Sequence, residues 1–240
     1  MILVLSGEGP TDLGQCNNAQ GLCSDPYFQP GPMAVLVDNI VAKKLKYSML
    51  AVTPAAVRYV GEQFLANLAK ARKGNRVSLV GKKQGQETAY FYINAWMLGE
   101  FAQKLEEDEE DEAVAVFFRD CDGTRAAANS LWNEKYQSIV DGFLRSGFQR
   151  GVPMLPKPKS EAWLLCAAQT PPYNNCVCLE DLPGNDASPN SAKMQLQLAF
   201  PQQVTSASLV AWLMVTPFDE TKAAVMPSFD AFLKKLWAAI

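Results

Sequence analysis

The chain has 240 residues, of which 48% are hydrophobic and 20% are charged, the proportions of a soluble globular protein with a substantial core. No apolar run approaches the roughly 18 residues that cross a bilayer, and the N-terminus lacks the basic start of a signal peptide, so we expect a cytoplasmic protein with no membrane partner. A net charge of −3 argues against nucleic acid binding through bulk positive charge.

Two features of the composition limit the chemistry. The chain contains no histidine, which removes the commonest general base and the usual transition-metal ligand, so hydrolysis has to depend on carboxylates, lysines or metal-bound water. The six cysteines match no zinc-binding spacing. Without an export signal we expect reduced thiols, with a Cys16–Cys23 disulfide as the alternative.

Hydrophobic periodicity in the N-terminal half predicts strands and helices separated by polar segments. The expected strands are 2–6 and 76–80, and the expected helices are 33–46, 54–73 and 87–107. Thr53 and Pro54 have the chemistry of an N-cap and a first helical position, so the second helix is expected to begin there. The acidic run 106–112 is expected to be a solvated helix end or loop.

The C-terminal half begins with the strongest strand pattern, five consecutive apolar or aromatic residues at 114–118. The further expected elements are a helix at 124–146, a strand at 152–155, a short helix capped by Ser160, a polar loop at 170–192, and helices at 192–199, 206–215 and 228–240. Pro153 interrupts the strand at 152–155 and predicts that it lies at a sheet edge.

The alternation of strands and helices predicts an α/β fold with a parallel sheet flanked by helices. Ligands of such sheets bind beyond the carboxyl ends of the strands, where Glu8, Asp120 and Asp122 fall. Asp120 and Asp122 are two residues apart in an extended segment, so their side chains project to the same side. Converging carboxylates favour a hard cation such as Mg²⁺; a solvated turn is the alternative.

A strand that ends in Glu8, followed after an α/β alternation by a strand that ends in Asp120-Cys121-Asp122, resembles the TOPRIM domain. That domain is shared by topoisomerases, primases, small ribosomal-RNA maturation nucleases and OLD-type (overcoming lysogenization defect) nucleases. The stretch 157–163 is similar to a region of the OLD-type nucleases, and it looks closer still to small stand-alone TOPRIM-like proteins of bacteria and phages.

The resemblance implies a division into domains and a function. A TOPRIM-like (Rossmann-like) catalytic domain is expected at 1–168, with an insertion at about 13–53, and a loop with a helical C-terminal extension at 169–240. The implied function is a metal-dependent nuclease that cleaves DNA or RNA with Mg²⁺ or Mn²⁺ as its cofactor. A separately encoded ATPase partner and a role in antiviral defence are left open.

The same resemblance assigns roles to individual residues. The carboxylates expected to hold the metal ions are Glu8, Asp120, Asp122 and Glu161. Lys159 or Lys157 is expected to steady the scissile phosphate. For Glu161 the alternative is an acid in the first turn of a helix, favoured by the helix dipole, and for each lysine it is a solvated loop.

Two further segments are candidates to contact a substrate. The turn Gly184-Asn185-Asp186 and Lys193 are candidates to reach the cleft, with a plain Asx-type turn as the alternative. Residues 41–90 carry ten Lys or Arg against two Glu. We expect this basic segment to lie beside the cleft mouth and to contact backbone phosphates, with solvated helix faces as the alternative.

Two other functions stay open. The motif that begins at Asp120 also matches haloacid-dehalogenase-type phosphatases, in which the first aspartate is the nucleophile; Glu8 would then have no role. The other function is a non-catalytic TOPRIM-like module that binds an ATPase or effector partner through its C-terminal helices.

Overall fold

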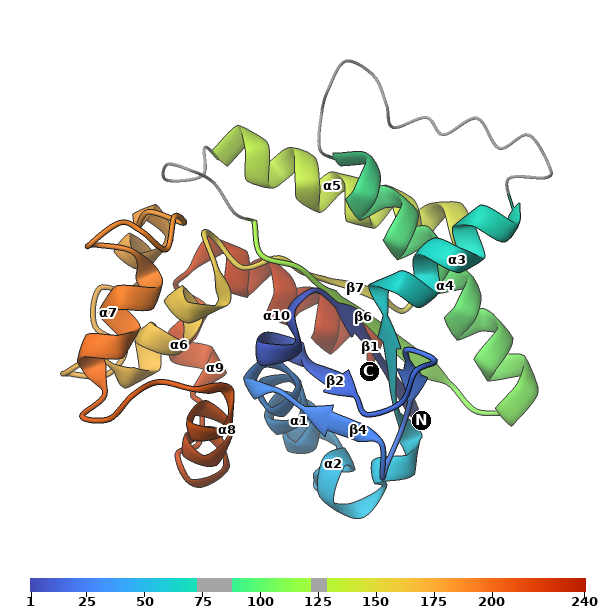
Figure 1. The fold of residues 1–240 in the computed structure, drawn as a ribbon, viewed down its shortest axis with the longest axis horizontal. Coiled ribbons are helices and arrows are strands. Elements are labelled where there is room, and N and C mark those ends of the chain that lie inside the picture. The colour runs from blue at the N-terminus through green and yellow to red at the C-terminus, as the bar shows by residue number, and fades with distance from the viewer. Residues whose placement is uncertain (73–87, 122–128) are drawn as a thin grey trace.

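The computed structural model describes residues 1–72, 88–121 and 129–240 (Figure 1). Its centre is a mixed, mostly parallel five-stranded sheet in the order β3-β5-β1-β6-β7. In that order the strands are Leu22–Cys23, Val57–Gly61, Ile2–Gly7, Ala113–Phe118 and Gly151–Met154. Four of them are parallel, whereas the two-residue β3 runs antiparallel to β5. The expected parallel sheet is therefore mixed at one edge.

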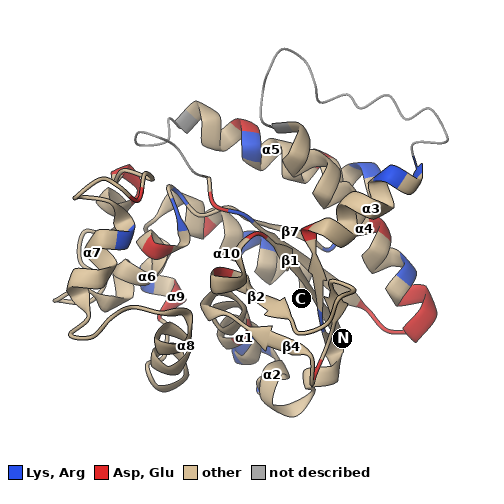
Figure 2. Ribbon diagram, in the orientation of Figure 1, with Lys and Arg blue, Asp and Glu red and all other residues tan. Residues whose placement is uncertain are grey.

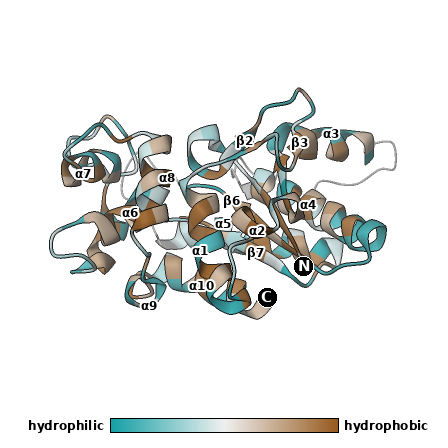
Figure 3. Ribbon diagram, turned by 90° about the horizontal axis from the view of Figure 1, so that it is seen from below, coloured by the Kyte–Doolittle hydropathy of each residue, from teal (hydrophilic) through white to brown (hydrophobic). Residues whose placement is uncertain are grey.

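Helices cover both faces of the sheet (Figures 1 and 3). The helices are α1 Pro32–Leu45, α2 Met49–Val52, α3 Glu62–Arg72, α4 Thr88–Glu109, α5 Asn129–Ser146, α6 Ser160–Ala168, α7 Ala192–Ala199, α8 Ser206–Val215, α9 Glu220–Ala223 and α10 Pro227–Ala239. Short turns at Gly9–Leu13, Pro54–Ala56 and Cys176–Asp181, and a small antiparallel pair of strands, β2 Gly14–Cys16 with β4 Phe28–Pro30, complete the described elements.

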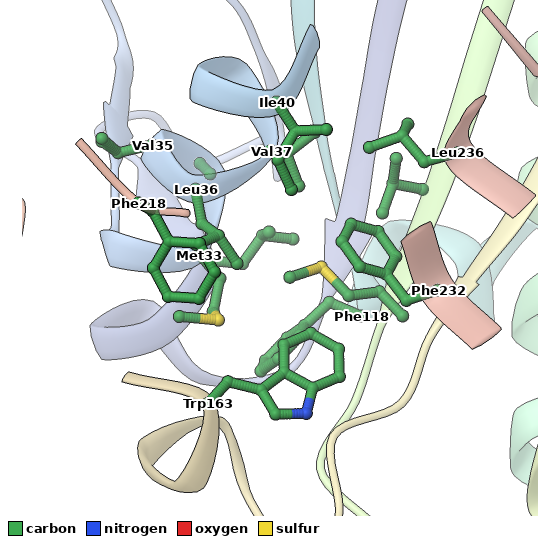
Figure 4. Packing of buried hydrophobic residues seen from close by; sticks show 14 of the residues in the cluster. Met33, Val35, Leu36, Val37, Ile40, Phe118, Trp163, Phe218, Phe232 and Leu236 are labelled. Carbon is green, nitrogen blue, oxygen red and sulfur yellow. The ribbon is translucent and has the colours of Figure 1, made fainter. Parts of the chain in front are cut away.

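The central strand β1 separates two hydrophobic cores because successive side chains point to opposite faces. Leu3 and Leu5 lie in the core formed with α1, α6, α8 and α10, and Ile2 and Val4 lie in the core formed with α3, α4 and α5. In Figure 4 the first core brings Trp163 and Phe232 against residues of α1. Helix α10, which belongs to the expected C-terminal extension, thus covers the same sheet as the N-terminal helix.

The second strand of the sheet lies where a helix was expected. Residues from Thr53 form a single 3-10 turn, then strand β5 and only then helix α3. The expected helix from 54 is therefore wrong up to Gly61. The buried Val57 and Val60 fit the helical spacing of the residues that follow as well as they fit a strand. The expected strand 76–80 lies outside the described residues.

Several other elements agree closely with the expectations. Helices α1, α4, α7, α8 and α10, strands β1 and β6, and the edge strand β7 lie within a few residues of their expected positions. The N-cap of α6 is Lys159 and Ser160 is its first helical residue, so the expected Ser160 cap is shifted by one position. The acidic run forms the end of α4 and the residues that follow it, where the ribbon is red in Figure 2.

The cysteines differ from the expectation of reduced thiols. Disulfides join Cys16 to Cys23 and Cys166 to Cys176, while Cys121 is buried after β6 and Cys178 is exposed. The first bridge connects the two short strands β2 and β3, and the second connects α6 to the turn at 176–181. Within the described part of the chain, no helix combines the length and apolarity that a membrane crossing requires.

Candidate carboxylate site at the strand ends

Three charged residues follow aligned positions at the carboxyl ends of neighbouring strands. In the register of the sheet, Gly7 of β1 lies opposite Gly61 of β5 and Phe118 of β6. The next residues along the chain are Glu8, Glu62 and Arg119. Because parallel strands end at one edge, these side chains meet although the residues are more than 50 positions apart in the sequence.

Arg119 connects the two glutamates of this row. Its Nη2 lies 2.8 Å from Oε2 of Glu8, and its Nη1 lies 2.9 Å from Oε1 of Glu62. The three side chains are about one-quarter exposed or less, so water screens these ion pairs less than surface pairs. Burial raises the pKa of Glu62, and the positive charge of Arg119 opposes that rise.

Asp120 links the strand ends to helix α6. Its backbone N–H donates to Oε1 of Glu8 at 3.3 Å, and its carboxylate Oδ1 accepts from the backbone N–H of Ser160 at 2.9 Å. The second bond places the carboxylate at the N-terminus of α6, where unsatisfied backbone N–H groups favour an anion. Asp120 therefore lies between the strand-end row and the helices of the C-terminal half.

Asp12 and Glu161 form the floor of a cleft beside Asp120. Oδ1 of Asp12 accepts from the buried Ser160 hydroxyl at 3.1 Å, and its Oδ2 accepts from the Thr11 hydroxyl at 3.2 Å. Burial raises the pKa of Asp12, although these hydrogen bonds and the two nearby lysines oppose the rise. The surroundings of Asp12 thus disfavour the charged form of its carboxyl group.

Glu161 lies in the first turn of α6 and is largely buried. Among the described residues, its Oε2 is shielded from solvent and has no hydrogen-bond partner. Burial raises the pKa of Glu161, and the negative charges of Asp12 and Asp186 raise it further against the opposing effect of Lys159. An uncompensated buried carboxylate oxygen is costly, and a cation would remove that cost.

The rim of the cleft carries compensated charges. Asp186 bridges two lysines, with 3.0 Å from its Oδ1 to Nζ of Lys159 and 3.0 Å from its Oδ2 to Nζ of Lys193. Partial burial works against ionisation of Asp186, but the hydrogen bonds and charges of both lysines lower its pKa. The same bond raises the pKa of Lys193. Rim and floor therefore differ in how their carboxylates are balanced.

The floor and the rim enclose a cleft of about 620 Å³. Its polar lining includes the residues just described, and its apolar wall comes from α6, α7, α8 and the segment before α8. The wall residues are Leu164, Met194, Leu196, Val204 and Leu209. The C-terminal helices thus contribute one wall of the cleft that opens beside Asp120, on the side where α6, α7 and α8 gather in Figure 1.

The structure brings together several residues singled out in the sequence. Glu8 and Asp120 are in contact, and Glu161, Lys159, Asp186 and Lys193 line the cleft with Asp120. Asp122 lies outside the described residues. Glu62 was not identified in the sequence because it was expected inside a helix, not at a strand end; Asp12, four residues after Glu8, was not singled out either.

The basic segment 41–90 does not line the cleft in its described part. Lys43 instead pairs with Glu220, Arg58 with Glu109 and Arg72 with Glu100. The expectation that this segment lies at the cleft mouth is therefore wrong for these residues. Each of them instead forms an ion pair with an acidic residue of a neighbouring helix. Lys73 and the basic residues up to Lys83 lie outside the described residues.

The donor set of the site is suited to a hard cation. Glu8, Asp12, Asp120 and Glu161 supply carboxylate oxygens, the ligands that Mg²⁺ prefers, and Mg²⁺ often binds through one or two carboxylates while retaining water. In residues 1–72, 88–121 and 129–240, no three acidic or cysteine side chains are grouped closely enough to hold a metal by themselves. These carboxylates therefore supply the type of donor that Mg²⁺ and Mn²⁺ take, without a group of three ligands already assembled in the described part of the chain.

The geometry thus contains a row of charged residues at three strand ends and a carboxylate-floored cleft beside it. Both features depend on the register of the sheet and on the packing of α6 against Asp120. Compared by sequence and by structure, the chain matches no protein-family model, no curated protein and no solved structure.

Proposed function

We propose that this protein is a metal-dependent nuclease that cleaves phosphodiester bonds of DNA or RNA. The observation that carries the proposal is the contact between Glu8 and Asp120, 112 residues apart, at the ends of adjacent parallel strands. Asp120 also accepts a hydrogen bond from the backbone N–H of Ser160, and both residues line a cleft with carboxylates on its floor and lysines at its rim. The resemblance of both strand-end motifs to TOPRIM domains supports the same function.

The proposed roles follow from the positions of the side chains. Glu8 and Asp120 would hold one Mg²⁺ or Mn²⁺, and Asp12 and Glu161 would hold a second. When bound, such ions neutralise the negative charge that develops on a phosphodiester during cleavage. The expected assignment of Glu161 to the metal site is retained here because of its unpartnered buried oxygen.

Lys193 and Lys159 would bind the phosphate next to the scissile bond. Both lysines already contact a carboxylate of Asp186 at 3.0 Å, and a phosphate oxygen has the charge and acceptor geometry to take that place. The apolar wall beside them is suited to the uncharged faces of a sugar or base. The cleft thus offers a place for the charged and the apolar parts of one nucleotide.

The proposal is tested by cleavage of a panel of single-stranded DNA, duplex DNA, RNA and tRNA, each with Mg²⁺, Mn²⁺ or a chelator. Glu8→Gln and Asp120→Asn are expected to lower the rate at least about 100-fold, because each removes a charged oxygen ligand of the proposed ion. Glu107→Gln, on an exposed acid at the end of α4, is the matched control and is expected to cleave as the native protein does.

Other outcomes of this panel support the rival functions. Hydrolysis of small phosphomonoesters that survives Glu8→Gln but not Asp120→Asn would favour a phosphatase that uses Asp120 as its nucleophile. Binding of nucleic acid or of a separately encoded ATPase without any metal-dependent cleavage would favour the non-catalytic module. An ATPase partner and a role in antiviral defence remain predictions.

A further inference from the structure

Glu8 and Glu62 depend on the same guanidinium. Each accepts one bond from Arg119, through different nitrogens, at 2.8 and 2.9 Å. A guanidinium has a single positive charge and a planar fork that can also grip one carboxylate with two parallel bonds. Because its one positive charge is shared by two carboxylates, Arg119 neutralises neither of them completely. A stronger ion pair with one glutamate therefore means a weaker ion pair with the other.

Aromatic side chains fix Arg119 in this divided position. Its guanidinium carbon lies 4.6 Å from the ring centre of Tyr90 and 5.3 Å from that of Phe91, both in α4. The Tyr90 hydroxyl also donates to Oε2 of Glu62 at 3.3 Å. Tyr90 therefore contacts both Arg119 and Glu62, and α4 keeps one nitrogen of the guanidinium on Glu62 while the other bonds Glu8.

From this geometry we infer that Glu62 is a positioning residue: by drawing Arg119 partly away from Glu8, it sets how readily Glu8 accepts a divalent cation. The inference rests on the proposed function, in which Glu8 is a ligand of that cation. Arg119 and the cation carry like charges and bind the same carboxylate, so they oppose each other at Glu8. Glu62 reduces that opposition without being a ligand itself.

The inference predicts effects of opposite sign on cation affinity. With Arg119→Met, the competing charge is lost and Mn²⁺ is expected to bind about tenfold more tightly. With Glu62→Gln, Arg119 is left to Glu8 alone, and Mn²⁺ is expected to bind several-fold more weakly. If the cluster only stabilised the fold, both variants would weaken binding or neither would change it.

The experiment measures the Mn²⁺ dissociation constant by electron paramagnetic resonance for the native chain, both variants, the double variant and Glu8→Gln. In the Arg119→Met background, Glu62→Gln is expected to have no further effect, because its influence passes through Arg119. An equal weakening in both backgrounds would show that Glu62 acts by its own charge, and the inference would be overturned.

The matched controls are Arg72→Met and Glu100→Gln. These residues form an Arg–Glu pair of 2.7 Å that also lies over an aromatic ring, that of Trp96 at 5.5 Å. Neither control is expected to change Mn²⁺ affinity. Arg119→Lys is a second variant in case the methionine disturbs folding: it keeps the charge, but a single ammonium cannot reproduce the fork.

A second measurement separates this inference from the proposed function. In chelator, urea unfolding gives the coupling between Arg119 and Glu8 from a double-mutant cycle, once with Glu62 present and once in the Glu62→Gln background. Shared use of Arg119 predicts a stronger coupling in the Glu62→Gln background. An unchanged coupling overturns the inference. A stronger coupling with no Mn²⁺ binding to the native chain would retain the shared use of Arg119 but overturn the cation site, and with it the proposed function.

Discussion

The floor and the rim of the cleft contain the same kind of side chain in opposite environments. On the floor, burial raises the pKa of Asp12 and Glu161, and one oxygen of Glu161 has no hydrogen-bond partner in the described chain. At the rim, Asp186 lies between Lys159 and Lys193, whose combined effect lowers its pKa despite partial burial. At the rim the carboxylate charge is neutralised by lysines, whereas the floor carboxylates are placed to gain from a bound cation.

This difference indicates how one cleft can serve two purposes. Carboxylates that lack a protein cation gain most from a bound metal ion, since the ion removes the cost of their burial. Lysines that are already paired can exchange a carboxylate for a phosphate without being moved. The floor is therefore suited to the metal ion and the rim to the substrate.

The largest expected effect separates floor from rim by activity. Asp12→Asn and Glu161→Gln are expected to lower the metal-dependent cleavage rate about 100-fold, because each removes a charged ligand. Asp186→Asn is expected to leave kcat within about threefold and to lower KM, since Lys193 is then released for the phosphate. Steady-state kinetics with a fluorescent oligonucleotide measures both constants. Equal losses in all three variants would remove the distinction between floor and rim.

A second prediction concerns the stability of the floor. Ser160→Ala removes the hydroxyl that donates to Asp12 at 3.1 Å and leaves a buried acceptor less satisfied, which is expected to cost about 1–2 kcal/mol. The measurement is urea unfolding in chelator at neutral pH. Ser206→Ala, which removes another hydroxyl that lines the same cleft, is the matched control, and a change as large as that of Ser160→Ala would contradict the role of the buried hydroxyl.

A third prediction uses the pH dependence of the floor. Since the pKa of Glu161 is raised on folding, its charge destabilises the fold as pH rises through and above its usual value of 4.5. Glu161→Gln is therefore expected to stabilise the metal-free protein by about 1 kcal/mol at neutral pH and not at all below pH 4.5. Thermal unfolding across that range measures the gain, and a loss of stability at neutral pH would contradict the account.

The smallest effect has the opposite sign and belongs to the rim. The pKa of Asp186 is lowered on folding, so its stabilising contribution is present above the usual value of 3.8 and is lost as pH falls through the lower folded pKa. Asp186→Asn is expected to destabilise the protein by about 0.5 kcal/mol at neutral pH, since the group is partly exposed. If that loss persisted at pH 2, the ion pairs would not be its cause.

The strand ends were predictable because two strands have continuous apolar sequences. Residues 2–6 and 114–118 are buried on both faces, and acids that follow such strands fall at one edge of a parallel sheet. Strand β5 was hidden because Val57 and Val60 continue the helical spacing of Leu65 and Leu68. Glu62 was therefore not predicted as a site residue, since its place at the sheet edge depends on where β5 ends.

Other features of the site depend on contacts that sequence spacing does not specify. The bond from Ser160 to Asp12 spans 148 residues, and the disulfide between Cys166 and Cys176 forms only because the turn after α6 folds back on it. The two ion pairs of Arg119, with Glu8 and with Glu62, likewise require α4 to pack over the strand ends. Such contacts follow from tertiary structure, whereas the elements that carry them follow from local patterns.

The central claim is that the carboxylates around Asp120 bind the divalent cation of a nuclease. Anomalous diffraction from crystals soaked in Mn²⁺ tests it most directly. The account predicts an anomalous peak at a coordination distance of roughly 2.0–2.3 Å from the Asp120 carboxylate, with an oxygen of Glu8 as a second ligand. A strongest peak at the acidic run 106–112, with none at Asp120, would contradict the claim.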